Sequence, residues 1–235
     1  MHDRPASRAF TTMDPVGMPL TPLAFIVSGA GAGLLLALAV RIAPWRRLRS
    51  NDLTHVFLGS TFALILLWSI RASVDAGFAF HLLGTAGLAL VVGPALALVG
   101  GAIVVIVTSL IQAIPLSTVP VAFLLEVALP VMIVTLVLRI VESRLPSNLF
   151  VYLFVAGFFG AGLAMAAAAF AALGSLAAVA RIARESAFAE FAPYIVYLAF
   201  GEATLTGMLL TLGVIYRPRW IATYDIDRYL PRPTR

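Results

Sequence analysis

Three ionisable side chains lie in long apolar stretches of the sequence, where they could do chemistry. His81 opens one stretch, and Glu126 and Glu202 each lie inside another. Within a membrane span, such residues are costly unless they face a cavity, so each is a candidate site. Neutral imidazole is a common ligand of first-row transition metals. A carboxyl group can instead be protonated and hydrogen-bond to a backbone carbonyl or a threonine.

Each candidate also has a purely structural interpretation. His81 could be an interfacial histidine that bonds to a carbonyl, and Glu126 and Glu202 could hold neighbouring helices in register. Thr85 and Thr206 are further polar candidates in the same stretches. The sequence does not show whether these side chains meet in space. If they met in one water-filled pocket, they could serve as an intramembrane acid and base, which is the least favoured interpretation.

The first two residues form a second candidate metal-binding unit. The α-amine of Met1, the backbone nitrogen of His2 and its ring can chelate one ion in a tetragonal arrangement suited to nickel or copper. The chain has no Cys, which excludes thiolate metal sites and Cys nucleophiles. No nucleotide-binding or hydrolase motif is present, so we expect no enzyme activity. Any active transport would draw on an ion gradient or a separate ATPase.

Membrane helices are the elements that must position these residues. The 235 residues are 61% hydrophobic and only 11% charged, against about 45–50% and about 25% in soluble domains. A chain of this size cannot bury so much apolar surface in one water-soluble core. Water-soluble enzymes, nucleic-acid binders, disordered tails and disulfide scaffolds are therefore excluded.

We expect an all-α, polytopic integral membrane bundle of about seven transmembrane helices in the lipid bilayer. Residues 1–19 form a polar N-terminal segment, residues 20–216 the transmembrane domain and residues 217–235 a basic cytoplasmic tail. The expected spans cover residues 20–40, 54–70, 78–92, 95–114, 121–138, 149 to about 180, and 194–216. The third and fourth spans are short and separated by Gly93-Pro94, which allows a tight turn or re-entrant geometry there.

The arginines indicate the orientation of the chain. With the N-terminus outside and the C-terminus inside, eleven arginines lie on the inner side and five on the outer side. Cytoplasmic loops are enriched in basic residues, so this count favours the N-out, C-in arrangement and an odd number of spans.

Small residues recur at helical spacing in two of the spans. Gly29, Gly33 and Ala37 lie on one face of the first span, and Gly157, Gly160 and Gly162 lie in the sixth. Such stripes let helices approach closely in lipid. Packing within the chain is the favoured interpretation of both, and a docking face for a partner is the alternative.

Several of these stretches together resemble the CbiM/NikM family. Phe80-His81-Leu82-Leu83-Gly84-Thr85 followed by Gly93-Pro94 resembles its His…Gly-Thr…Gly-Pro signature, and the stretch from Glu202 to Gly207 resembles its Glu-Gly-x-x-Thr-Gly. A divergent bacterial branch also shares the stretches 144–152 and 216–220. The resemblance extends from about Trp45 to Leu230 and so covers most of the chain.

The resemblance implies the substrate-capture membrane component of an energy-coupling factor ABC transporter for cobalt or nickel, in the bacterial inner membrane. It implies a seven-span fold with the N-terminus outside and a metal bound near the outer face by Met1, His2 and His81. The divalent metal would be transported cargo rather than a permanent cofactor. Expected partners are a transmembrane scaffold subunit, with the Gly29, Gly33 and Ala37 stripe as a docking face, and cytoplasmic ATPase subunits.

The chain departs from the family pattern at two places that touch the metal site. The turn-like element that precedes the first span begins at Met13, twelve residues after Met1. If Met13 is the start, His2 is absent and Asp14 takes its position. The family's Asn before the fifth span is replaced by Val121-Ala122. The alternative function is therefore a membrane interaction or assembly protein that kept the fold but lost metal binding.

Overall fold

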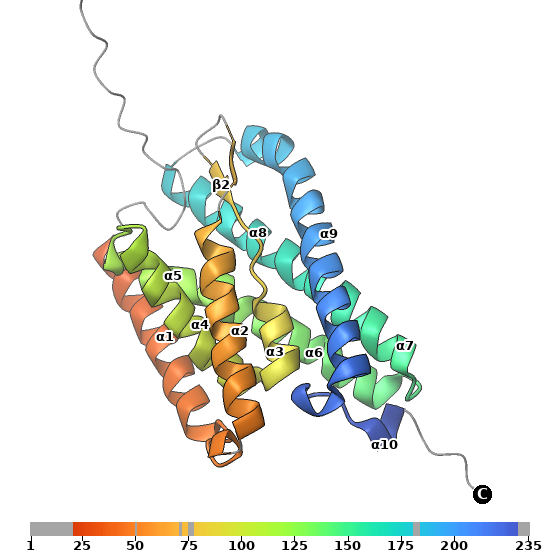
Figure 1. Ribbon diagram of the computed structural model, residues 1–235. Coiled ribbons are helices and arrows are strands. Elements are labelled where there is room, and N and C mark those ends of the chain that lie inside the picture. Colours follow the sequence, from red (N-terminus) through yellow and green to blue (C-terminus); the bar gives the residue numbers. More distant parts are fainter. Residues whose placement is uncertain (1–20, 50, 71, 75–77, 181–183, 230–235) are drawn as a thin grey trace, which may run out of the picture.

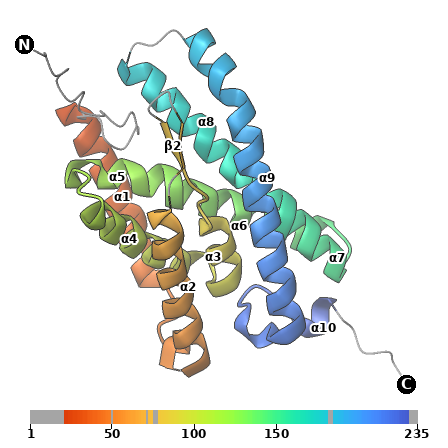
Figure 2. The ribbon, with the colours of Figure 1, turned by 45° about the horizontal axis from the view of Figure 1, so that its top comes forward.

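The computed structural model describes residues 21–229 except 50, 71, 75–77 and 181–183. Its helices stand together in a tilted bundle, and a short hairpin lies at one end (Figures 1 and 2). In chain order the elements are α1 (Pro22–Ile42), η1 (Arg47–Arg49), α2 (Asn51–Ser69), β1 (Ala72–Val74), β2 (Phe78–Phe80), α3 (Thr85–Val92), α4 (Pro94–Ile111), η2 (Leu116–Thr118), α5 (Val119–Ala122), η3 (Phe123–Ala128), α6 (Leu129–Arg144), α7 (Leu149–Val151), η4 (Tyr152–Phe159), α8 (Gly160–Ala180), α9 (Arg184–Tyr216), η5 (Pro218–Trp220) and α10 (Ile226–Tyr229).

Within the described residues, six helical stretches are long and apolar enough to cross a membrane. They have 18 to 29 residues, and at about 1.5 Å per residue they match a hydrocarbon layer of about 30 Å. The prediction of an all-α, polytopic membrane bundle is therefore confirmed. The stretches are Pro22–Ile42, Asp52–Ser69, Pro94–Ile111, Leu116–Arg144, Leu149–Ser175 and Pro193–Tyr216.

The prediction of one continuous helix over residues 78–92 is wrong. Residues 78–80 are strand β2, which pairs antiparallel with β1 in the register Ala72↔Phe80. An extended segment follows, and only the eight residues from Thr85 to Val92 are helical, as α3. The helix begins after Gly84, whose φ of +64° lies in the left-handed region that favours glycine. Apolar composition does not distinguish an extended buried segment from a helix, so the sequence pattern missed this break.

The path of the chain nevertheless places the first and the last of the six long helical stretches as expected. In Figure 1 the chain runs down through α1, up through α2, and down again through the extended segment and α3. It then runs up through α4, down through α5 to α6, up through α7 to α8, and down through α9. The start of α1 and the end of α9 therefore lie at opposite ends of the bundle.

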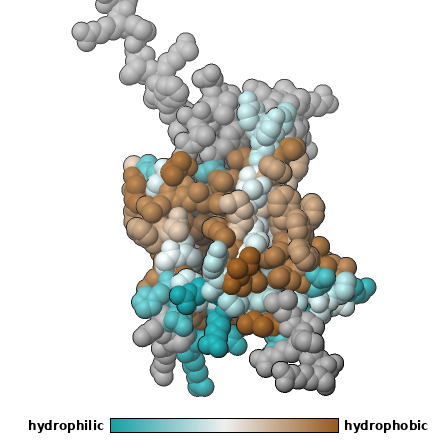
Figure 3. Space-filling model, turned by 45° about the vertical axis from the view of Figure 1, so that its right-hand side comes forward, coloured by the Kyte–Doolittle hydropathy of each residue, from teal (hydrophilic) through white to brown (hydrophobic). Residues whose placement is uncertain are grey.

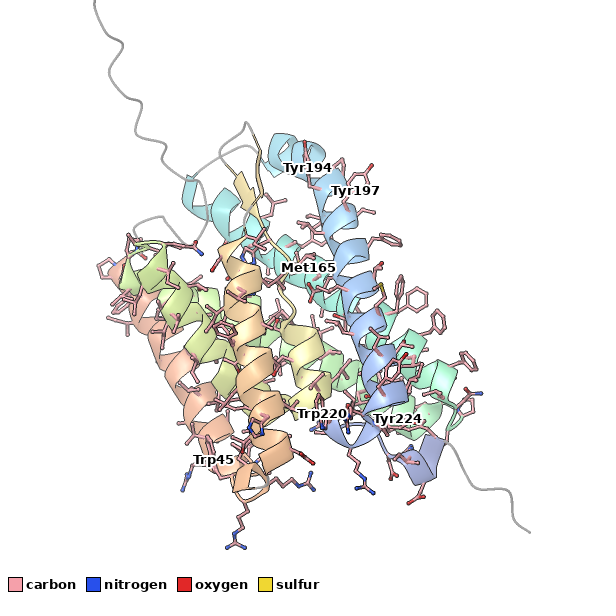
Figure 4. The ribbon with its side chains drawn as sticks, in the orientation of Figure 1. Trp45, Met165, Tyr194, Tyr197, Trp220 and Tyr224 are labelled. Atoms are coloured by element: carbon pink, nitrogen blue, oxygen red, sulfur yellow. The ribbon has the colours of Figure 1, made fainter. Side chains whose placement is uncertain are left out.

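Polar and aromatic side chains mark the two ends. Hydrophilic residues gather at the lower end in Figure 3, below a broad hydrophobic band. Figure 4 shows Trp45 and Trp220 at this lower end and Tyr194 and Tyr197 near the upper end, as expected for aromatic residues at the two membrane interfaces. The lower end also contains the arginine-rich loops that follow α1 and α9.

The two small-residue stripes have different surroundings. A Cβ at Gly162 would meet the backbone oxygen of Ala199 at 3.2 Å, and one at Gly157 would meet a Leu210 methyl at 2.8 Å. These glycines let α9 approach η4 and α8, so the intramolecular interpretation holds for the sixth span. At Gly29 and Gly33 a Cβ would meet nothing within 4 Å. The intramolecular interpretation is therefore wrong for the stripe on α1.

Gly101 provides a test of the packing between α4 and η3. A Cβ there would lie 2.2 Å from one methyl of Val127 and 3.2 Å from its Cβ, and Val127 is fully buried. Because a β-branched side chain cannot swing away, Gly101→Ala should destabilise the fold by about 1–3 kcal/mol. The effect would be measured as a lower Tm in detergent.

Gly59→Ala on α2 is the matched control, because a Cβ at Gly59 meets nothing within 4 Å. It should leave the Tm unchanged or raise it, since alanine favours the helix. Equal Tm values for the two variants would contradict the packing described for α4 and η3.

Candidate functional site

The break in the third crossing contains the candidate metal ligand. We call residues 81–84 the His81 segment; it connects β2 to α3 and is not helical. Figure 1 shows it as the thin strand-like trace that runs from β2 down to α3, between α2 and α9. Because an extended chain makes no helical hydrogen bonds of its own, its backbone groups need partners from neighbouring elements.

The imidazole of His81 is half-buried and held in a defined orientation. Its ring lies against the Trp68 indole, with 4.8 Å between centroids and 53° between planes. Its Nδ1 lies 3.2 Å from the carbonyl oxygen of Leu82. A carbonyl can only accept, so this contact favours the tautomer with a proton on Nδ1. The lone pair is then on Nε2, which is the arrangement of a metal-ligating histidine.

Trp68 fixes the same segment from the α2 side. It is almost completely buried, and its indole N–H donates to the carbonyl of Leu83 at 2.8 Å. The Gln112 side chain in turn donates to the Trp68 carbonyl at 3.0 Å. The last turn of α2 is thus bonded to both the His81 segment and the end of α4.

Glu202 holds the segment from the α9 side. The side chain is 1% exposed, and its two carboxyl oxygens accept the backbone N–H groups of Leu83, at 2.9 Å, and of Gly84, at 2.6 Å. The carboxyl group therefore satisfies two donors that would otherwise be unpaired inside the bundle. It also lies at the start of α3, where the helix dipole favours negative charge.

Two threonines position α3 below this point. Thr85, the first residue of α3, is fully buried and donates to the backbone carbonyl of Glu126 in η3 at 2.9 Å. Thr206 lies one turn after Glu202 on α9 and faces Gly87, where a Cβ would come within 3.3 Å of its hydroxyl. Thr85 therefore bonds α3 to η3, and Thr206 packs against α3.

The structure thus brings the predicted residues of the bundle interior to one place. His81, Glu202, Glu126, Thr85 and Thr206 all lie at or beside the His81 segment and α3. Glu202 binds backbone, so the structural interpretation fits it better than a ligand role. Within the described part of the chain, no three His, Cys, Asp or Glu residues form a group that could hold a metal ion.

A metal on His81 would therefore need further ligands from elsewhere in the chain. Met1 and His2 are the residues predicted for this role, and they lie outside the described residues. Metal ligation by Met1, His2 and His81 stays a prediction. Trp68 was not predicted as a partner of the segment; the only local signal is a tryptophan near the end of an apolar stretch that Arg71 closes.

The predicted docking residues lie on the other side of the bundle. Gly29 and Gly33 line a groove of about 200 Å³ that α1 forms with α4, α5 and η3, bounded by Ile106, Val119 and Phe123 among others. Ala37 continues the stripe and is exposed. The groove is lined almost entirely by apolar and small residues and lies open at the surface of the bundle.

Comparisons with known proteins agree with this architecture. The family described as the cobalt uptake substrate-specific transmembrane region matches residues 18–220. A crystal structure of a truncated transition metal transporter superposes with a TM-score of 0.65 at 15% sequence identity, over 84% of this chain and 96% of that one. At this identity the structural likeness shows the fold. No curated protein sequence matches the chain.

Glu202→Gln should destabilise the bundle through the His81 segment. The amide nitrogen would replace one of two acceptors and would face a backbone N–H, leaving a buried donor unsatisfied at a cost of about 1–3 kcal/mol. We expect a lower Tm in detergent and faster hydrogen exchange at Leu83 and Gly84. Glu142→Gln is the control, since the bond at Glu142 uses its backbone carbonyl. An unchanged Tm and unchanged exchange for Glu202→Gln would disprove this anchoring role.

Proposed function

Because the chain belongs to the CbiM family of cobalt uptake substrate-specific transmembrane components, we propose that it captures Ni²⁺ or Co²⁺ for an energy-coupling factor transporter. The protein is a multi-pass membrane component of metal uptake, and the bacterial inner membrane is its proposed location. The metal is cargo: it would bind at the outer end of the bundle and be released inward when partner subunits drive a change of orientation. No permanently bound cofactor is part of this proposal.

The observation that carries the proposal is that neighbouring side chains fix both the ring of His81 and the segment on which it lies. Trp68 orients its ring, the Leu82 carbonyl favours a proton on Nδ1, and Glu202 and Trp68 hold the segment on which it lies. Fixed imidazole orientation with a bonded second nitrogen is typical of metal-ligating histidines. Met1 and His2 would complete the site, with the α-amine, a backbone nitrogen and two imidazoles as a donor set suited to Ni²⁺.

The distribution of arginine supports the direction of transport. The loops at the lower end in Figure 1 contain most of the arginines of the described chain, from Arg41 to Arg49, at Arg144, and from Arg217 to Arg228. The positive-inside rule assigns this end to the cytoplasm. The hairpin of β1 and β2, from which the His81 segment descends, lies at the opposite end and would face outside.

The alternative function is a membrane assembly protein that kept the fold and lost the site. The observation that favours it is that the described residues contain no complete metal-binding group. The two functions differ in one measurable property, which is metal binding by the purified full-length chain.

Purified protein with its own N-terminus should bind Ni²⁺ or Co²⁺ at one site. Loss of an outer-shell partner costs metal sites about 10–100-fold in affinity, so His81→Ala should weaken binding by at least that factor. Isothermal titration in detergent would measure the Kd. His55→Ala, which removes an exposed histidine from the lower part of α2, is the control and should bind as the unmodified chain does.

Two results would separate the hypotheses. Absence of Ni²⁺ and Co²⁺ binding by the unmodified chain would favour the assembly function. Equal metal affinity after His81→Ala would show that His81 is not a ligand. The intact mass of the purified chain would show whether it begins at Met1 or Met13, and therefore whether His2 is present.

We further propose that the transmembrane scaffold subunit docks on the stripe of Gly29, Gly33 and Ala37, with the ATPase subunits bound to the scaffold on the cytoplasmic side. The support is that Gly29 and Gly33 are open although small-residue stripes are typical of closely packed helices in lipid. A partner helix could approach the α1 backbone there, beside the groove formed with α4 and η3.

Gly33→Leu should therefore reduce complex formation with a co-expressed scaffold subunit, since the added side chain would hold a partner helix away from α1. The readout is the amount of scaffold that co-purifies at equal expression. Gly59→Leu adds the same volume at an open position on α2 and should leave the complex intact. Full complex formation by Gly33→Leu would exclude this face as the dock.

A further inference from the structure

The break between α3 and α4 leaves buried carbonyl groups that need partners. In a continuous helix, the Leu90 carbonyl would accept from the residue four positions later, but Pro94 has no N–H. The chain also turns at Gly93, where φ is +87°, so α4 departs from the axis of α3. Leu90 is almost fully buried, and water cannot easily satisfy its carbonyl.

The segment after α9 provides those partners. We call residues 217–229 the inner strap; it contains η5 and α10 and passes beneath α3. The Thr223 hydroxyl donates to the Leu90 carbonyl at 2.6 Å, and the Ala222 N–H donates to the Val91 carbonyl at 2.7 Å. These two bonds join residues more than 130 positions apart in the sequence.

Tyr152 fixes Thr223 from the other side. Their oxygens are 2.7 Å apart, and because the only Thr223 hydroxyl proton is directed at Leu90, Tyr152 must be the donor. Tyr152 is fully buried, and its ring packs against those of Tyr224 and Tyr229, with centroids 5.4 Å and 5.0 Å away. Burial raises the pKa of Tyr224 and of Tyr229, so this aromatic cluster stays uncharged.

The inner strap is also bonded to α6. Arg228 donates to the backbone carbonyl of Glu142, and its guanidinium lies over the Tyr229 ring at 5.7 Å. The inner strap is therefore bonded to α3, η4 and α6, and these contacts hold it against the inner end of the bundle.

Helix α3 is consequently held at both ends. Glu202 binds the backbone at its outer end, and Thr223 and Ala222 bind the carbonyls at its inner end. The helix itself has eight residues, or about 12 Å of rigid helix. A displacement of the inner strap along this axis would move α3 and, with it, the His81 segment.

We propose that Thr223 is a positioning residue for metal capture: its bond to Leu90 fixes α3, and α3 sets the position of His81 at the outer end. The inference rests on the proposed function. It makes the inner strap the route by which a change at the cytoplasmic face alters metal affinity outside, and by linkage metal binding would alter the strap. Without this role, the strap only seals the lower end of the bundle.

The test compares Thr223→Val, which keeps the shape and removes the donor, with Thr223→Ser, which keeps the hydroxyl. Full-length protein in detergent is measured for Ni²⁺ affinity and for hydrogen exchange at the Leu83 and Gly84 amides. Thr223→Val should weaken Ni²⁺ binding about 5- to 20-fold, within the usual range of coupling between distant sites, and should speed exchange at both amides. Thr223→Ser should restore both properties.

If the inner strap only closes the lower end of the bundle, the same experiment gives a different result. Exchange would then rise only near residues 88–93 and 220–224, Leu83 and Gly84 would remain protected, and the Ni²⁺ affinity would not change; this outcome overturns the proposal. If Thr223→Val does not fold, Tyr152→Phe removes only the donor to Thr223, and it should shift both readouts in the same direction by a smaller factor. Unchanged readouts for a folded Tyr152→Phe would likewise overturn it.

Failure of the proposed function would be seen separately. If the unmodified chain binds neither Ni²⁺ nor Co²⁺, metal capture is wrong, yet the exchange rates of Leu83 and Gly84 still decide whether Thr223 acts through α3. Faster exchange at these amides in Thr223→Val, restored in Thr223→Ser, would support the mechanical link without metal. Unchanged exchange at Leu83 and Gly84 would contradict the link between Thr223 and the His81 segment.

Discussion

The need to satisfy backbone hydrogen bonds inside a membrane governs this structure. Lipid offers no partner for a free N–H or carbonyl, so a chain that leaves the helical path must find partners within the protein. The third crossing leaves that path twice, at the His81 segment and at Gly93-Pro94. Glu202 and Trp68 satisfy the first departure, and Thr223 and Ala222 satisfy the second.

This constraint explains why a buried carboxyl group lies at the centre of the bundle. Glu202 accepts two N–H groups from one short stretch of backbone, so its cost of burial is offset by the donors that it satisfies. His81 differs, because its ring is oriented by the Trp68 indole and by the Leu82 carbonyl and the bonds that hold its segment are made by other side chains. The arrangement separates the residue proposed to bind metal from the residues that hold it in place.

The α-helices around this break have two kinds of face. Glycines of η4 and α8 lie against α9 and allow the bundle to close around α3. The glycines of α1 lie on an open face beside a groove. Small residues at helical spacing therefore correspond to internal packing in one span and to an outward surface in another.

The sequence by itself determined the membrane environment, six of the long apolar crossings, the opposite placement of the two ends and the family. These follow from composition, from apolar length against bilayer thickness and from motif order, all of which are local or additive properties. It also identified the residues that converge on the third crossing, because ionisable and hydroxyl side chains stand out in an apolar background.

Only the tertiary structure decided that the third crossing is half extended and half helical, that Glu202 binds backbone, that the α1 stripe is open and that Thr223 reaches Leu90. The bonds of Glu202 to Gly84 and of Thr223 to Leu90 join residues 118 and 133 positions apart. Apolar periodicity carries no information about them, since in lipid both the inward and the outward faces of a helix are apolar. Long-range hydrogen bonds, rather than hydrophobic pattern, therefore fix where His81 lies.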